Sequence, residues 1–226
     1  TISDNTATND GGGIYCFNSS PAITGCTITG NTADYDGGGM YCKASTAILT
    51  DCIFQLNTGA RGGGYYARDA GDTVFSNCSF LDNTATNHGG GLSIGESGGS
   101  ITGCTITGNL SGGNVDGGGG VELYKCTTSI IESTISDNTS SNYGGGIYCH
   151  ESNPDGNPTI SGCIITNNTA SYNGGGICSR LNSIPTITNC TITGNTAPFG
   201  GGGIWCNFSS PTISDCTISG NTATNG

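Results

Sequence analysis

The chain has 226 residues, 42 of them glycine, and a formal net charge of −11 with only five Lys and Arg residues. This glycine content and the scarcity of good helix formers exclude a helical protein, and the lack of a three-residue glycine period excludes collagen. Too few cations are present to build a phosphate-binding face, and no apolar run is long enough to span a membrane as a helix. We therefore expect neither a nucleic-acid partner nor membrane insertion by this segment.

Two motifs alternate along the chain, and the Asn of the second recurs at intervals of 26–30 residues. One is a glycine triplet followed by an apolar residue, and the other is Ile-x-x-Asn or Phe-x-x-Asn. The residues after the triplets are Ile14, Met40, Tyr65, Leu92, Val121, Ile147, Ile177 and Ile204. The Asn residues are Asn5, Asn31, Asn57, Asn83, Asn109, Asn138, Asn168, Asn195 and Asn221.

Each repeat contains three short segments with the composition of strands, illustrated by residues 39–42, 46–49 and 52–55. Glycine triplets, Ser-Pro pieces and the repeated Asn separate them, as expected of corners. A unit of this size cannot bury its apolar face alone, whereas stacked units can. The sequence therefore predicts one all-β domain over residues 1–226, a right-handed parallel β-helix of about eight coils with three strands per coil.

The repeated Asn and Gly residues have structural roles in such a fold. Asn tolerates the left-handed backbone conformation at a corner, and its amide can bond the Asn residues above and below. Glycine permits the positive φ that a tight corner requires. We therefore expect the nine Asn residues to form a ladder along the solenoid.

The Gly-Gly-apolar motif and the two Phe-x-x-Asn motifs at Phe54 and Phe80 resemble the paired repeats of the chlamydial polymorphic outer-membrane proteins and similar bacterial surface proteins. The resemblance extends over the whole chain, although the other repeats have Ile in place of Phe. It implies a right-handed β-helix passenger or stalk on a cell surface, often with adhesive function.

Thirteen Cys residues favour an extracellular protein with disulfides and occur mainly in two columns, one before the Ile-x-x-Asn segment and one after the glycine corner. Coils with a Cys in the second column also have one in the first, which suggests disulfides within coils. The alternative is a core of free thiols that act as small apolar side chains. The disulfides expected are Cys16–Cys26, Cys42–Cys52, Cys149–Cys163, Cys178–Cys190 and Cys206–Cys216.

Aromatic residues gather on both sides of the glycine corner, where exposed rings could stack on the sugars of surface glycans. The alternative is that they simply fill a pleated surface. The candidate binding residues are Tyr15, Tyr41, Tyr66, Tyr148, Trp205, Tyr35, Tyr143, Tyr172 and Phe199.

A second face carries Thr-x-Thr pairs, which resemble the ice-binding surface of β-helical antifreeze proteins. Substitutions such as Ile53 with Gln55, and Ser79 with Leu81, interrupt this array. Threonine is also a good strand residue in its own right. The Thr pairs are Thr27/Thr29, Thr105/Thr107 and Thr191/Thr193.

Catalytic and metal sites have weaker support. Polysaccharide-active β-helices need clustered carboxylates in a groove, and the candidate clusters fit a solvated surface better. Two His residues and no Cys-x2-Cys pair argue against zinc, so we expect no metal or other cofactor, with calcium at acidic corners as the open alternative. The clusters are His150, Glu151 and Asp155, and Arg61, Arg68, Asp69 and Asp72; the acidic corners are Asp10, Asp34, Asp36 and Asp116.

These observations favour a non-enzymatic extracellular β-helix that acts as a fibre, stalk or adhesin segment on a cell surface. Residues 1–9 and 217–225 agree at eight of nine positions, so both ends have the same phase of the repeat. We expect a segment of a longer array, or copies stacked head to tail into filaments. An ice-binding protein and a polysaccharide-active enzyme are the alternatives.

Overall fold

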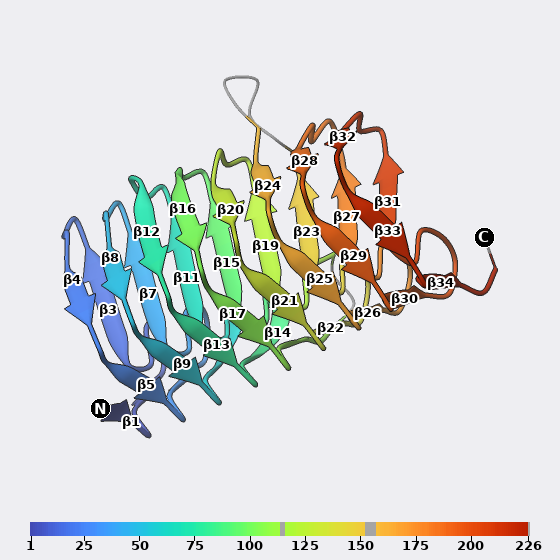
Figure 1. Ribbon diagram of the computed structural model, residues 1–226. Helices are drawn as coiled ribbons and strands as arrows, with labels where there is room; N and C mark the ends of the chain where they lie inside the picture. The colour runs from blue at the N-terminus through green and yellow to red at the C-terminus, as the bar shows by residue number, and fades with distance from the viewer. Residues whose placement is uncertain (114–115, 152–156, 226) are drawn as a thin grey trace.

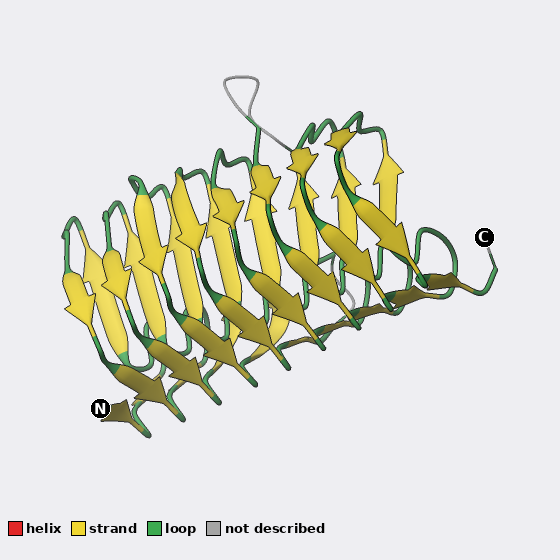
Figure 2. Cartoon of the chain, viewed as in Figure 1, coloured by secondary structure: helices red, strands yellow, loops and turns green. Residues whose placement is uncertain are grey.

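The computed structural model describes residues 1–113, 116–151 and 157–225. These residues form 34 short strands and no helix, and therefore no helix that could cross a membrane. The strands make four parallel sheets that run the length of the molecule (Figures 1 and 2). Each strand pairs with its equivalents one coil before and one coil after, which confirms the predicted parallel β-solenoid of about eight coils.

Sheets A and B, nine strands each, lie on either side of the repeated Asn. Sheet A contains β1 (Ile2–Ser3), β5 (Thr27–Thr29), β9 (Ile53–Gln55), β13 (Ser79–Leu81), β17 (Thr105–Thr107), β21 (Thr134–Ser136), β25 (Ile164–Thr166), β29 (Thr191–Thr193) and β33 (Thr217–Ser219). Sheet B contains β2 (Thr6–Ala7), β6 (Thr32–Ala33), β10 (Thr58–Arg61), β14 (Thr84–His88), β18 (Leu110–Ser111), β22 (Thr139–Ser140), β26 (Thr169–Ala170), β30 (Thr196–Ala197) and β34 (Thr222–Ala223).

Sheets C and D, eight strands each, complete the coils, which we number 1–8 by their sheet C strand. Sheet C contains β3 (Ile14–Phe17), β7 (Met40–Lys43), β11 (Tyr65–Arg68), β15 (Leu92–Gly95), β19 (Val121–Tyr124), β23 (Ile147–His150), β27 (Ile177–Arg180) and β31 (Ile204–Asn207). Sheet D contains β4 (Ala22–Thr24), β8 (Ile48–Thr50), β12 (Thr73–Ser76), β16 (Gly99–Thr102), β20 (Ser129–Ile131), β24 (Thr159–Ser161), β28 (Thr186–Thr188) and β32 (Thr212–Ser214).

A coil therefore has four strands where the sequence predicted three. The segments predicted at 39–42, 46–49 and 52–55 correspond to β7, β8 and β9. The additional strand belongs to sheet B and directly follows the repeated Asn; in β6 it is only two residues long. Two residues are too few to show an alternation of apolar and polar side chains, so the backbone pairing with neighbouring coils is what defines this strand.

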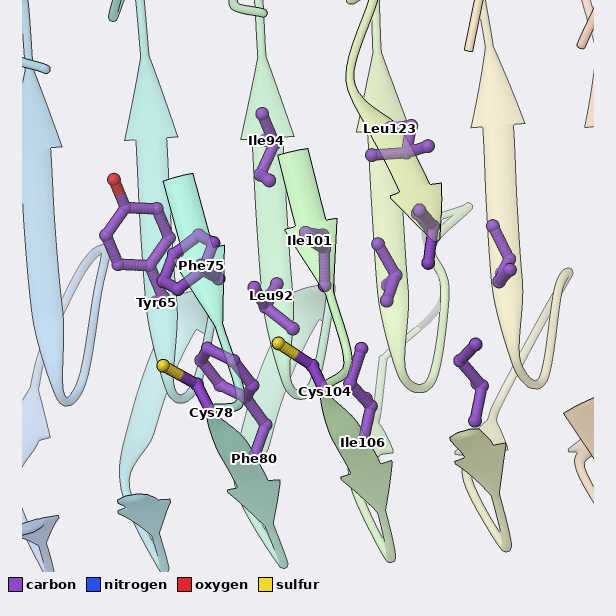
Figure 3. Close-up of a cluster of buried hydrophobic side chains, with 14 of the residues drawn as sticks. Tyr65, Phe75, Cys78, Phe80, Leu92, Ile94, Ile101, Cys104, Ile106 and Leu123 are labelled. Carbon is purple, nitrogen blue, oxygen red and sulfur yellow. The ribbon is translucent and has the colours of Figure 1, made fainter. Parts of the chain in front are cut away.

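Inward-facing side chains fill the space between the sheets (Figure 3). Phe54 and Phe80 stack with ring centroids 4.9 Å apart, and the edge of Phe75 meets the ring of Phe80 at 5.4 Å. Tyr65 packs against Phe75 at 4.8 Å and places its hydroxyl 3.2 Å from Thr73 Oγ1. Full burial of each such side chain contributes about 1.5–3 kcal/mol, and the same arrangement recurs in every coil with Ile or Leu.

The repeated Asn residues form a continuous hydrogen-bonded ladder. The backbone N–H and the side-chain Nδ2 of Asn83 both donate to Oδ1 of Asn109, each at 3.0 Å. Nδ2 of Asn83 also donates to the carbonyl oxygen of Phe54 in the preceding coil at 2.9 Å. Asn83 and Asn109 are fully buried, so each amide satisfies polar groups that water cannot reach.

The backbone conformation at this corner differs from the expectation. The left-handed residue is the one before the ladder Asn, such as Leu56 with φ 54° or Asp82 with φ 53°. The left-handed residue turns the chain, which leaves the following Asn free to point its amide along the ladder. The prediction that Asn itself adopts this conformation was wrong.

The three glycines of each triplet have different roles. The first has a positive φ in every triplet except the one before Val121, as in Gly62 at 59°. A Cβ on the second, Gly63, would lie 2.5 Å from the carbonyl oxygens of Gly90 and Thr84. A Cβ on the third, Gly64, would lie 2.7 Å from the Gly91 carbonyl oxygen and 3.2 Å from Cγ of Asn83. The triplet is therefore needed because the corner packs directly against the next coil and the Asn ladder.

All thirteen Cys residues are free thiols in the structure, so the expected intracoil disulfides are not formed. The thiol interactions instead run between coils, from Cys16 to Cys42 and from Cys78 to Cys104, because strand register places equivalent residues next to each other. Most of these thiols are buried in the core, as the free-thiol alternative expects. The pairs that are absent are Cys16–Cys26, Cys42–Cys52, Cys149–Cys163, Cys178–Cys190 and Cys206–Cys216.

Candidate functional site

The outer face of sheet C carries two columns of side chains, from the second and fourth residues of each strand. The corner between sheets B and C runs beside the first of them. Column 2 contains Tyr15, Tyr41, Tyr66, Ser93, Glu122, Tyr148, Cys178 and Trp205. Column 4 contains Phe17, Lys43, Arg68, Gly95, Tyr124, His150, Arg180 and Asn207.

The aromatic rings of column 2 stack on one another along the solenoid axis. Tyr15 and Tyr41 have centroids 5.1 Å apart, and Tyr41 and Tyr66 are 5.5 Å apart. The guanidinium of Arg61 lies 4.9 Å from the Tyr66 ring centre and closes this stack. Burial raises the pKa values of Tyr41 and Tyr66 to about 12, so both phenols stay protonated at neutral pH.

The expected exposed aromatic edge is therefore only partly exposed. Tyr41, Tyr66 and Tyr148 are at most 6% exposed, because neighbouring rings and the corner residues cover their faces. This excludes a ligand stacking on those three rings in this conformation. Tyr15, Tyr35, Tyr172 and Phe199 are exposed, and Tyr143 and Trp205 are half-buried.

A second aromatic stack occupies coils 6–8. Cys178 lies in column 2, one residue before the Cys column to which the sequence assigned it, and pairs in register with Tyr148 and Trp205. The ring of Tyr143 stacks on both, at 5.5 Å from Trp205 and 6.2 Å from Tyr148. Because the Cys178 side chain is small, it leaves space between the rings of Tyr148 and Trp205, and Tyr143 from the corner packs there.

Between the two stacks lies a polar cluster built around Glu122. Oε1 of Glu122 lies 2.9 Å from Nε2 of His150 and 3.0 Å from Nδ1 of His88. Oε2 accepts a hydrogen bond of 2.6 Å from the Ser93 hydroxyl. The His150 ring stacks on Tyr148 with centroids 4.4 Å apart. Three coils and one corner therefore converge on a single buried carboxylate.

The two imidazoles stabilise Glu122 as a carboxylate. Burial alone would raise its pKa, but the contacts with His150 and His88 outweigh that effect and hold the pKa well below its usual range. Burial would lower the pKa of His88, but Glu122 outweighs it and raises the pKa above its ordinary value. The cluster is thus a buried ion pair with its charges compensated.

Two arginine–aspartate pairs flank this cluster. Arg61 binds Asp36 through Nε at 2.9 Å and Nη2 at 2.6 Å. Arg180 donates to Asp116 at 2.6 Å and lies 4.3 Å from the centre of the Tyr143 ring. Two of the acidic corners considered for calcium are therefore engaged by guanidinium groups. Among the described residues, no group of three or more His, Cys, Asp and Glu side chains could hold a metal ion.

A pocket of about 250 Å³ opens beside the cluster. Its origin is local: in coil 4 the outward residues are Ser93 and Gly95, where coil 3 has Tyr66 and Arg68. A second hollow of about 530 Å³ adjoins it towards coil 2 and shares Arg61. The pocket is lined by Arg61, Tyr66, Arg68, His88, Ser93, Gly95, Glu122, Tyr124 and His150.

The structure thus brings together Arg61, Arg68 and His150, which the sequence had assigned to two separate clusters. Glu151 lies outside and pairs with Lys125 at 3.4 Å. Asp155 lies outside the described residues, and Asp69 and Asp72 do not line the pocket. Sequence reasoning missed Glu122, His88 and Ser93. The sequence did contain one signal for this site: Glu122 is a charged residue at the column 2 position, which is Tyr in coils 1–3 and 6.

Residues 1–128 and 90–226 match the model of a protein family described as the right-handed β-helix region. Together these matches extend over the whole chain. No curated protein and no solved structure gave a match in the corresponding searches. The comparison therefore establishes the fold and its family.

Proposed function

Because the chain belongs to the right-handed β-helix family, we propose that it is an adhesive segment of an extracellular β-solenoid. Its ligand is an anionic polymer, such as an acidic surface glycan, that lies along the outer face of sheet C. The resemblance of its repeats to those of bacterial surface proteins supports the extracellular setting. The role is binding by a rigid scaffold, without catalysis.

The observation that carries this proposal is the placement of the basic residues. The chain has five Lys and Arg and two His residues against a net charge of −11. Four of them lie in column 4 of sheet C, Lys125 directly follows β19, and Arg61 and His88 are the last residues of the sheet B strands β10 and β14, where they line the same pocket. The seven are Lys43, Arg61, Arg68, His88, Lys125, His150 and Arg180.

Such a distribution favours a ligand of opposite charge. The carboxylates on this face, such as Asp36 and Asp116, are paired with its cations, whereas the rest of the acidic surface has no cations to attract a polyanion, so the ligand is directed to this face. In column 4, Lys43 and Arg68 are adjacent, and His150 and Arg180 are adjacent. Neighbouring coils are about 4.8 Å apart, so column 4 has two pairs of basic residues along the solenoid axis, separated by Gly95 and Tyr124.

The geometry of Glu122 favours binding over glycoside hydrolysis. Hydrolysis of that kind uses two carboxylates, one of them free to act as an acid. Among the described residues, Glu122 is the single carboxylate that lines the pocket. Its oxygens are already occupied by Ser93, His88 and His150, so it orders the site rather than serving as a free acid.

The test is binding of the protein to immobilised polygalacturonate and alginate, with dextran as the neutral control. We expect binding to the acidic polymers alone, weakening as salt rises because the contacts are screened. The double variant Arg68→Gln/Arg180→Gln should lose most of it. Thr50→Glu/Thr102→Glu on sheet D, which changes the net charge equally, should not. Equal binding to dextran, or equal loss in both variants, would contradict the proposal.

A further inference from the structure

The pocket beside Glu122 arises where the outward side chains of sheet C are smallest. Ser93 and Gly95 remove the two side chains that would cover the sheet at coil 4, whereas coils 3 and 5 retain Arg68 and Tyr124 as walls. A volume of about 250 Å³ is slightly below the range for drug-sized ligands. It fits one small group or one sugar unit rather than an oligosaccharide.

The two arginines of the pocket differ in how strongly neighbouring carboxylates bind them. Arg61 is held by Asp36 in a two-point contact. Arg68 approaches Asp69 and Glu96 only at 3.9 Å, beyond hydrogen-bonding distance. The guanidinium of Arg68 therefore keeps donors that can bind a ligand, and a guanidinium matches the two oxygens of a carboxylate.

The lining of the pocket is richer in basic than in acidic groups: Arg61, Arg68, His88 and His150 accompany one carboxylate, Glu122. Asp36 balances Arg61, and the two carboxylates nearest Arg68, those of Asp69 and Glu96, lie outside the pocket at 3.9 Å. The guanidinium of Arg68 is therefore the cation that the pocket offers to a ligand. This is an anion-attracting pocket in a strongly acidic protein.

We infer that this pocket seats a single carboxylate, that of one acidic sugar unit, with Arg68 as its principal contact, and that His88 makes the affinity pH-dependent. The inference rests on the proposed function and specifies where along the face one unit of the polymer is recognised. The remaining basic side chains would contact the polymer only through its overall charge.

The pH dependence follows from the groups that face the two imidazoles. His88 faces Glu122 and Arg61 and is also bonded to the backbone at Asp116. His150 faces Glu122, Tyr124 and Tyr148. Its neighbour in column 4, Arg180, is engaged with Asp116. A protonated His88, whose pKa Glu122 raises above its ordinary value, attracts the ligand carboxylate, so affinity falls as pH rises and His88 loses its proton. A sugar carboxylate stays ionised throughout, because carboxyl pKa values lie near 4.

The experiment is calorimetric titration of the whole chain with D-glucuronate, with glucose and the methyl ester of glucuronate as uncharged controls. We expect glucuronate to bind at least tenfold more tightly than either control, and about fivefold more tightly at pH 5.5 than at pH 8.5. Arg68→Gln should weaken glucuronate binding about tenfold. Thr50→Glu on the outer face of sheet D, which changes the net charge equally, should have little effect.

A second variant tests the pocket without touching its charges. Gly95→Phe fills the hollow, and its Cβ meets no atom closer than 3.4 Å, so the fold should tolerate it. It should abolish glucuronate binding, whereas Thr102→Phe on the outer face of sheet D should not. For the unsubstituted chain, binding of the acidic polymers without binding of glucuronate would overturn this inference and leave the proposed function standing. Absence of both would overturn the proposed function as well, and a flat pH profile would refute the role of His88.

Discussion

Replacing Asn109 with Ala should destabilise the solenoid by about 2–6 kcal/mol. The backbone N–H of Asn83 loses Oδ1 of Asn109, its acceptor at 3.0 Å, and the Phe80 carbonyl loses the Nδ2 donor at 2.9 Å. Both groups lie in the buried core, and each unsatisfied group costs about 1–3 kcal/mol. The bond from the Asn109 backbone to Oδ1 of Asn138 survives, so the damage is concentrated one coil towards the N-terminus.

Urea unfolding gives the total loss, and amide hydrogen exchange locates it. We expect the Asn83 amide to lose protection in the variant. Asn142→Ala, in a corner outside the ladder, is the matched control and should change stability by less than about 0.5 kcal/mol. If Asn109→Ala changes stability no more than this control and the Asn83 amide stays protected, the ladder does not stabilise the fold.

Three further predictions concern the corners, the core and the pocket. Gly63→Ala places a Cβ 2.5 Å from two backbone carbonyls and should cost about 3 kcal/mol or more. Gly25→Ala has φ 59° but an open site and should cost about 1–2 kcal/mol, so equal losses in urea unfolding would contradict the packing argument. Quantitative alkylation after unfolding without reductant should modify all thirteen thiols, and a recovered disulfide-linked peptide would refute the free-thiol core. Thermal stability should peak between about pH 4.5 and 6.5: the lowered pKa of Glu122 gives stability that is lost below its ordinary pKa, and the raised pKa of His88 gives stability that is lost as pH rises through it. Glu122→Gln should flatten this profile, and an unchanged profile would show that the cluster does not govern it.

The repeat made the fold predictable from the sequence. Every coil meets the same steric requirement at its glycine corner and the same hydrogen-bonding requirement at its Asn, so both leave a periodic signal. The strands of sheet B were not predicted, because strands such as β6 have only two residues and show no alternation of apolar and polar side chains. The exposure of Tyr41 and Tyr66 was also mispredicted. Alternation places them outward correctly, but it carries no information on the corner and the rings that cover them.

The site could be predicted only in fragments, since its members are single departures from the repeat. His88 and Glu122 are 34 positions apart and belong to different sheets, yet they meet at 3.0 Å. Their meeting depends on the exact stacking of corners over sheet C, which the sequence does not encode as a pattern. Arg61 and Arg68 were noticed as charges in a looser coil, but nothing in their spacing relates them to His150.

A solenoid of equivalent coils separates the residues that maintain the fold from those that are free to serve another role. The ladder Asn and the glycine triplets recur because each coil needs them, so their recurrence requires no ligand. Column 2 has no such requirement: tyrosine stacks well there, yet coil 4 has Ser93 and coil 5 has a buried Glu122. Burying a carboxylate costs stability unless partners compensate it, and here both His residues of the chain are used to do so. A departure that costs stability, placed beside a pocket in the face, is better explained by ligand recognition than by the needs of the fold.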